Sequence, residues 1–215
     1  MKFVNLKKGD IVAILRDVDQ RYVCDIAREL MNQGINWVEV SLSNESNGLD
    51  CLEKLVNKYY NILQIGVGTV ISKEQVDKVM KLGVKYIITP GWNRDLITYI
   101  KNFDIKVIPG VFSPGEIIDA INFEIDTVKV FPADVLGIRF IKSILGPFPT
   151  LKIMAVGGIS KDNISDYYKA GCTFFGIGNE LVPRKASIED LDKIRTSAME
   201  YLKLIKECEY NDKSI

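Results

Sequence analysis

Eight short runs of apolar and β-branched residues alternate along the chain with longer amphipathic stretches, and this alternation narrows the possible folds more than any other feature. We predict strands over residues 11–16, 37–42, 63–70, 86–91, 106–111, 127–133, 152–159 and 174–181. Continuous apolar strands that alternate with helices are typical of a parallel sheet covered by helices. Eight such units without a linker predict an α/β fold, a compact (β/α)8 TIM barrel that occupies residues 1–215 as a single domain.

The stretches between the strands carry helix signals. Residues 20–31 place their apolar side chains on one face at helical spacing. Ser72 opens a second helix, and Ser113-Pro114 opens a third, with the proline in the first turn, where its missing N–H does no harm. Three glycines stand where helices should end: Gly34, Gly83 and Gly171. An open doubly wound sheet is the alternative fold, but no GxGxxG turn follows the first strand.

The composition limits the chemistry that the chain can perform. Lys and Arg together number 28, as do Asp and Glu, so the net charge is zero and no global field attracts nucleic acid or an anionic membrane. There is no histidine, which excludes Ser-His-Asp and Cys-His catalysis, HExxH zinc sites and histidine pH switches. Acid–base chemistry must come from Glu, Asp, Lys, Tyr or Cys, and we expect neither a metal nor another cofactor.

The cysteines and the apolar runs indicate the compartment. Cys24, Cys51, Cys172 and Cys208 are too far apart in sequence for a CxxC pair or a zinc knuckle, and we expect them to be reduced thiols rather than disulfides. The first ten residues contain no long apolar run, so we expect no signal peptide. No run of about 18 apolar residues is long enough to span a membrane. We therefore expect a cytoplasmic protein.

Two charged residues occupy strand positions that are predicted to point into the barrel. Lys129 and Glu39 each lie between two valines, and because strand side chains alternate, the valines face the helices. Burial lowers the pKa of a lysine and leaves a free amine, which can attack a ketone and form a Schiff base. Glu39 would then act as a general acid and base. The alternatives are a lysine that extends to the barrel mouth and a glutamate that only pairs with Lys129 or Arg16.

The predicted strand ends carry candidate binding residues. Arg16 ends the first strand, with donors suited to a carboxylate or phosphate, or to a surface ion pair. Glycine-rich turns end the seventh and eighth strands, at residues 157–160 and 176–179. Such turns in a barrel commonly bind phosphate through backbone N–H groups, although they can also be no more than tight turns. The segment 66–69, Gly-Val-Gly-Thr, should let a ligand approach the backbone.

An ordered series of motifs resembles a known family. In chain order these are WVEVSL around Glu39, GVGTV at 66–70, TPG at 89–91, IPG at 108–110, VKVFPAD at 128–134, GPF at 146–148, VGGIS at 156–160 and LVP at 181–183. Together they are similar to the bacterial 2-keto-3-deoxy-6-phosphogluconate aldolases, including the bifunctional 4-hydroxy-2-oxoglutarate aldolases. The resemblance covers nearly the whole chain.

The resemblance implies a class I lyase, one that forms a Schiff base and needs no metal. It would cleave a phosphorylated 2-keto-3-deoxy sugar acid, or 4-hydroxy-2-oxoglutarate, to pyruvate and an aldehyde. By this likeness Lys129 forms the Schiff base and Glu39 moves protons. The likeness also assigns Thr69, Pro90 and Phe131 to the pyruvyl pocket, and Gly157, Gly158, Gly178 and Asn179 to the phosphate. Family members are usually trimers, so we expect a homotrimer whose partner is a small-molecule substrate.

Two departures from the family pattern leave the substrate open. Ser43 stands where the phosphogluconate enzymes often carry an arginine for the substrate carboxylate, and Asn179-Glu180 stands where the phosphate turn often has serine. A carboxylate at Glu180 would repel a phosphate unless it points away. The segment around Arg16 looks more like the 2-keto-3-deoxy-6-phosphogalactonate branch, in which Arg16 would bind the carboxylate. A non-catalytic phosphosugar-binding barrel and another phosphate-binding barrel enzyme, such as an isomerase, are further alternatives.

Overall fold

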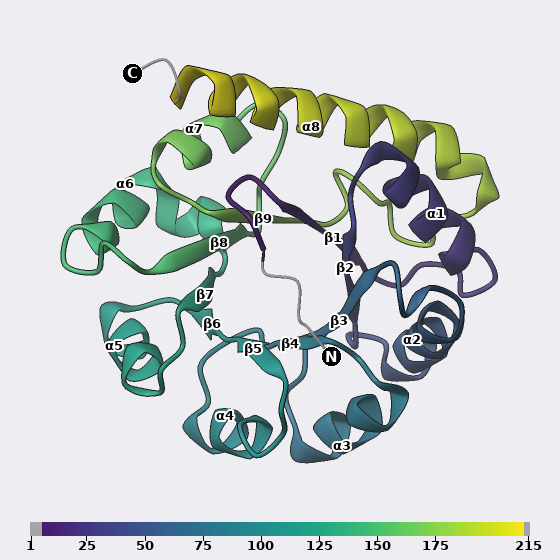
Figure 1. Cartoon of the computed structure of the whole chain (residues 1–215), viewed down its shortest axis with the longest axis horizontal. Coiled ribbons are helices and arrows are strands. Elements are labelled where there is room, and N and C mark those ends of the chain that lie inside the picture. Colours follow the sequence, from purple (N-terminus) through teal and green to yellow (C-terminus); the bar gives the residue numbers. More distant parts are fainter. Residues whose placement is uncertain (1–5, 213–215) are drawn as a thin grey trace.

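A ring of parallel strands surrounded by helices forms the molecule (Figure 1). The computed structural model describes residues 6–212, so residues 1–5, where the stretch considered for a signal peptide begins, lie outside it, as do residues 213–215. The strands are β1 (Ile11–Leu15), β2 (Trp37–Ser41), β3 (Gln64–Gly68), β4 (Tyr86–Ile88), β5 (Lys106–Ile108), β6 (Gly110–Val111), β7 (Thr127–Val130), β8 (Lys152–Val156) and β9 (Phe174–Ile177). The helices are α1 (Val23–Gln33), α2 (Glu45–Tyr59), α3 (Lys73–Leu82), α4 (Arg94–Ile100), α5 (Pro114–Asn122), α6 (Ala133–Leu145), α7 (Ile164–Lys169) and α8 (Leu191–Asp212), with a 3-10 turn at Ile188–Asp190.

The barrel closes at Pro109. The strand order is β5-β4-β3-β2-β1-β9-β8-β7-β6, and β5 and β6 are the two halves of the predicted fifth strand. Proline has no N–H for the ladder and interrupts the strand, but its carbonyl accepts a hydrogen bond from the Lys129 N–H at 2.8 Å. The barrel prediction is therefore confirmed, and the open-sheet alternative is wrong because both ends of the sheet meet in one strand.

The barrel strands separate two apolar clusters. Val38, Val40, Val128 and Val130 pack outward among the helices, as their alternation predicted. The interior cluster includes Val12, Ile14, Trp37, Tyr86, Ile88, Ile108, Met154, Val156 and Phe174. Glu39 pairs in register with Ile14 and Gly66, and Lys129 pairs with Gly110 and Met154. Both charged residues therefore belong to the inward register.

Helix caps follow the sequence signals, while the strands are shorter than predicted. The Ser72 side chain accepts from the Gln75 N–H, and Ser113 forms a capping box with Glu116. Gly34 and Gly83 adopt the left-handed conformation at helix C-caps, and Gly171 follows the cap of α7. The predicted strand ends at residues 69–70, 89–91, 131–132, 157–159 and 178–181 instead leave the ladder as loops, and Ala133 already begins α6. These loops gather the candidate site residues at the carboxyl end of the barrel.

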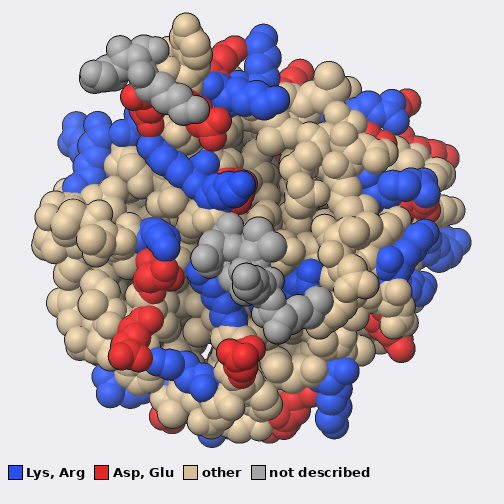
Figure 2. Space-filling model, in the orientation of Figure 1, with Lys and Arg blue, Asp and Glu red and all other residues tan. Residues whose placement is uncertain are grey.

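The last helix packs across the outside of α1 and α7 (Figure 1). Arg195 of α8 holds the buried Glu29 of α1, with 2.8 Å between its Nε and Oε1 of the carboxylate. In Figure 2 basic and acidic side chains intermingle on the face shown, in keeping with the zero net charge. All four cysteines are free thiols. Among residues 6–212, no helix has both the length and the apolar character required to cross a membrane.

Candidate active site

Lys129 and Glu39 face each other from opposite walls of the barrel. Glu39 lies on β2 and Lys129 lies on β7. In one direction around the barrel these two strands are separated by β1, β9 and β8, and in the other direction by β3, β4 and the strand broken at Pro109. The Glu39 and Lys129 residues are only 1% and 3% exposed. The prediction that both point inward is confirmed, and a lysine that extends to solvent is not what the structure shows.

Burial controls the protonation of this pair. It raises the pKa of Glu39, an effect opposed by the positive charges of Lys129 and Arg16. Burial lowers the pKa of Lys129, which Glu39 opposes and Arg16 reinforces. Within the described chain, Oε2 of Glu39 is buried without a hydrogen-bond partner. The site therefore offers an amine that loses its proton more readily than an exposed lysine and a carboxyl group that holds one more readily.

Glycines on β3 make room for protein side chains rather than for a ligand. A Cβ at Gly68 would lie 1.6 Å from Oε1 of Glu39, and one at Gly66 would lie 2.1 Å from the Tyr86 ring. The Tyr86 hydroxyl donates to the Val38 carbonyl at 2.6 Å and so fixes the ring beside Glu39's strand. The expectation that these glycines admit a ligand to the backbone is wrong, because Glu39 and Tyr86 fill the space.

Thr69 lies just beyond β3 in a strained conformation, with φ at 62°. Its hydroxyl lies 3.0 Å from that of Ser41, and Ser41 in turn donates to the Ser43 hydroxyl at 3.2 Å. Ser41 is 2% exposed and was not singled out from the sequence, although positions 37, 39 and 41 share one face of β2. The three hydroxyls form a polar cluster at the mouth of the barrel, where the expected arginine is missing.

Pro90 contacts the strand that neighbours Lys129. A Cβ at Gly110 would lie 2.4 Å from the Pro90 carbonyl carbon, and Gly110 pairs in register with Lys129. The Gly110 N–H donates to the Thr89 hydroxyl at 3.3 Å. Pro90 is thus close to the lysine's strand, but neither Pro90 nor Thr69 lines the pocket described next.

A pocket of about 250 Å³ opens at the ends of β7, β8, β9 and β1. The predicted residues that line it are Arg16, Phe131, Gly157, Gly158, Gly178 and Asn179. Glu180 and the apolar Ile14, Val156, Ile159 and Gly176 complete the lining. The Lys129 ammonium lies 4.8 Å from the centre of the Phe131 ring, so the pocket adjoins the buried pair.

The two glycine-rich turns present unused backbone donors. The carbonyls of Gly157, Gly158 and Gly178 accept hydrogen bonds from the Asp134 N–H, the Asn163 side chain and the Leu181 N–H respectively. In the described chain, none of the N–H groups of Gly157, Gly158, Gly178 and Asn179 has a protein acceptor. Backbone donors without partners around one pocket are the arrangement that binds an anion.

Arg16 follows β1 and joins this pocket to the buried pair. Its charge acts on both Glu39 and Lys129. Its Nε is buried and, within residues 6–212, has no hydrogen-bond partner. An unpartnered guanidinium donor in a pocket is suited to a carboxylate or phosphate. The surface ion pair that we weighed for Arg16 does not form among the described residues.

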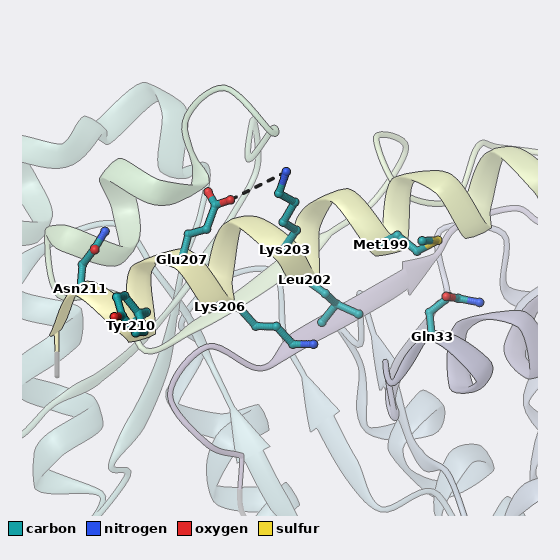
Figure 3. A pocket seen from close by; sticks show the side chains of 8 residues that line it. All are labelled: Gln33, Met199, Leu202, Lys203, Lys206, Glu207, Tyr210 and Asn211. Carbon is teal, nitrogen blue, oxygen red and sulfur yellow. Dashed lines mark ion pairs between the residues drawn. The ribbon is translucent and has the colours of Figure 1, made fainter. Parts of the chain in front are cut away.

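A larger hollow of about 680 Å³ lies on α8 and is not this site (Figure 3). Its lining includes Met199, Leu202, Tyr210 and a Lys203–Glu207 ion pair, 3.9 Å between Nζ and Oε1. None of the predicted site residues contributes to it. No cluster of three or more His, Cys, Asp and Glu that could hold a metal occurs among residues 6–212.

Comparison with known proteins assigns the class and then the family. The (β/α)8 barrel holds a buried lysine and a buried carboxylate beside a pocket with unused backbone donors, and the comparisons place it among the carbon–carbon lyases of the aldolase type. The chain belongs to the KDPG and KHG aldolase family, whose sequence model matches residues 4–197.

Relatives in this family act on different epimers. The chain is 32% identical to a 2-dehydro-3-deoxy-phosphogluconate aldolase of Pseudoalteromonas atlantica, over 87% of each chain. It is 28% identical to the 2-dehydro-3-deoxy-6-phosphogalactonate aldolase of Escherichia coli K12, over 85% of this chain and 89% of that one. A KDPG aldolase structure from Legionella pneumophila, with pyruvate captured as a covalent carbinolamine, superimposes with a TM-score of 0.77 at 28% identity over 91% of each chain.

Proposed function

We propose that this protein is a metal-independent class I aldolase that cleaves 2-keto-3-deoxy-6-phosphogluconate to pyruvate and glyceraldehyde 3-phosphate, and also cleaves 4-hydroxy-2-oxoglutarate to pyruvate and glyoxylate. The observation that carries the proposal is the buried Lys129–Glu39 pair beside a pocket lined with unused backbone donors. The carbinolamine in the related Legionella pneumophila enzyme supports a covalent lysine route.

In this route the neutral Lys129 amine attacks the C2 ketone and forms a carbinolamine, whose hydroxyl takes a proton from Glu39 and leaves as water to give a protonated imine. Glu39 removes the proton of the C4 hydroxyl, and the C3–C4 bond breaks. The bond's electrons pass to the imine and leave an enamine, while C4 departs as the aldehyde. Glu39 returns the proton to C3 of the enamine, and hydrolysis of the imine then releases pyruvate and the free amine.

The remaining pocket residues would hold the two ends of the substrate. Arg16, whose Nε lacks a partner, would bind the carboxylate. The N–H groups of Gly157, Gly158, Gly178 and Asn179 would bind the phosphate, and Phe131 would pack beside the imine. Thr69 and Pro90 would complete the pyruvyl end, next to Glu39 and Lys129 in the barrel strands. We also propose that the protein is cytoplasmic and acts as a homotrimer.

A second candidate substrate is the galactonate epimer. Ser43 supplies no charge for the substrate carboxylate, whereas Arg16 lies in the pocket with an unused donor. Arg16 in this role is the arrangement expected of the phosphogalactonate branch, to which the Escherichia coli relative belongs.

Cleavage of both phosphorylated epimers and of 4-hydroxy-2-oxoglutarate, assayed side by side with and without EDTA, tests the proposal. Release of pyruvate that is unaffected by EDTA is expected. Activity that depends on a metal would contradict the class I route, and no release of pyruvate from any of the three would contradict the proposed function. The ratio between epimers assigns the substrate.

The phosphate turn can be tested at Gly178, where a Cβ would meet nothing within 4 Å. Gly178→Asp should raise KM for the phosphorylated substrate at least about tenfold relative to Gly178→Asn, because the two side chains differ mainly in charge. Cleavage of 4-hydroxy-2-oxoglutarate should differ much less between the variants. Equal damage to both substrates would contradict a phosphate site. Gly158 is unsuitable for this test, because its φ is +68° and a Cβ would lie 2.4 Å from Asp134.

Arg16→Lys keeps the charge but loses the planar pair of donors. We expect capture of pyruvate at a subsaturating concentration to fall about tenfold, the size of one charge-assisted hydrogen bond. Adding Ser43→Arg should restore part of this capture, because the new guanidinium would reach the carboxylate from the turn that follows β2. Borohydride trapping of pyruvate in the wild type, the single variant and the double variant measures both effects. Undiminished trapping in Arg16→Lys would show that another group holds the carboxylate.

A further inference from the structure

Glu180 places an unpaired negative charge on the lining of the proposed phosphate pocket. It directly follows Gly178 and Asn179, whose N–H groups lack acceptors, and it lines the same pocket. Among the lining residues Arg16 is the only cation and Glu180 the only anion. Within the described chain, the exposed Glu180 carboxylate takes part in no ion pair or hydrogen bond.

Two further carboxylates act, together with Glu180, on a buried tyrosine of α8. The buried hydroxyl of Tyr201 on α8 has no hydrogen-bond partner in the described chain. Burial raises the pKa of Tyr201, and the charges of Glu180, Asp162 and Glu200 raise it further, so all three carboxylates lie near enough to act on this hydroxyl. Lys161 lies 6.0 Å from the centre of the Tyr201 ring, but its ammonium is paired with Glu200.

A phosphorylated substrate would therefore meet two opposing effects. The backbone donors attract its phosphate, which carries close to two negative charges at neutral pH. The carboxylate of Glu180 repels the same group, and water screens the repulsion only in part because the pocket is concave. A substrate that ends in a single carboxylate, such as 4-hydroxy-2-oxoglutarate, has less charge at this end and meets less repulsion.

We propose that Glu180 is a specificity-determining residue, whose unpaired carboxylate weakens the pocket's preference for a doubly charged phosphate and so favours 2-keto acids with a less charged distal end. This inference rests on the proposed function. We therefore expect the ratio of kcat/KM for phosphorylated over non-phosphorylated substrates to be lower in the wild type than in a variant without this carboxylate.

Glu180→Gln tests this with little change of shape. The matched control is Glu189→Gln, which removes one exposed carboxylate a short way along the chain but outside the pocket. We expect Glu180→Gln to raise kcat/KM for the phosphorylated substrate about three- to tenfold through KM, the effect of one partly screened charge. The value for 4-hydroxy-2-oxoglutarate should change less than about twofold, and the gain should shrink at high salt. The control variant should match the wild type on both substrates.

The outcomes separate this inference from the proposed function. Equal changes with both substrates, a change no larger than that of the control, or a loss of phosphorylated-substrate activity in Glu180→Gln would overturn the role of Glu180. If the wild type cleaves neither substrate, the proposed function fails, and Glu180 is then tested by the binding of inorganic phosphate alone. Tighter phosphate binding by Glu180→Gln than by wild type and control would support its effect on the pocket, and unchanged binding would overturn it.

Discussion

Lys129→Met is expected to reduce cleavage of every 2-keto acid substrate by at least about 10³-fold, because a Schiff base needs an amine and Lys129 is the only buried lysine among residues 6–212. Methionine has a similar length and suits the apolar surroundings of this position, where Met154 is the neighbour in register. Without the positive charge of Lys129 the buried carboxyl group of Glu39 holds its proton more firmly and stays neutral, so the variant should remain folded. Steady-state release of pyruvate measures the loss, and thermal unfolding confirms the fold.

Lys106→Met is a matched control for this prediction. Lys106 begins β5 at the opposite end of the barrel, and burial lowers its pKa too. Its ammonium lies 3.7 Å from an Asp126 carboxylate oxygen. Both residues lie at the amino ends of strands, whereas the proposed pocket lies at the carboxyl ends. This variant should keep its turnover at temperatures below its melting point. Turnover that survives in Lys129→Met, or that disappears in Lys106→Met, would contradict the assignment of the nucleophile.

Glu39→Gln is expected to lower turnover by about 10²- to 10⁴-fold, the usual contribution of a general acid–base group. Glutamine keeps the shape that fits against Gly68 but cannot take up and return a proton. Burial raises the pKa of Glu39, so the wild-type carboxyl group exchanges protons closer to neutral pH than an exposed one. Pyruvate should still bind, because the groups proposed to hold its carboxylate are unchanged.

Exchange of the pyruvate methyl protons with deuterated water measures this step directly, because it requires proton removal from C3 of the imine. Exchange should fall as far as turnover does, while borohydride trapping at saturating pyruvate persists. Glu29→Gln is the control: it removes another buried carboxylate, which Arg195 holds, and should affect stability but not exchange. A Glu39→Gln variant within about threefold of the wild type would make Glu39 a structural residue.

Local sequence patterns predicted the barrel and the inward register of its two charged residues. Lys129 and Glu39 stand out because valines flank both, and the alternation of a strand then fixes which way they point. The position of the two glycine-rich turns was also predictable. Each turn follows one of the last two strands, and neighbouring parallel strands bring their carboxyl ends together. These inferences needed only periodicity and chain order.

Contacts between segments that are distant in sequence could not be predicted from local sequence patterns. Nothing near Gly68 in the sequence shows that the Glu39 carboxylate occupies the space a Cβ would need. The Ser41–Thr69 hydrogen bond depends on the pairing of β2 with β3 and on a left-handed Thr69. The proline at position 109 indicates a break in the fifth strand. The pairing of β5 with β4 and of β6 with β7, which closes the barrel, depends on the global geometry.

Reduction with borohydride in the presence of pyruvate tests whether the Lys129 amine forms an imine with the substrate ketone. Peptide mass spectrometry of the trapped protein locates the label among all lysines, including Lys106 and Lys85, whose pKa values burial also lowers. We predict a reduced pyruvyl group on Lys129, formed equally well in the presence of EDTA. A label on Lys106 or Lys85, or no label on the active wild-type enzyme, would contradict it.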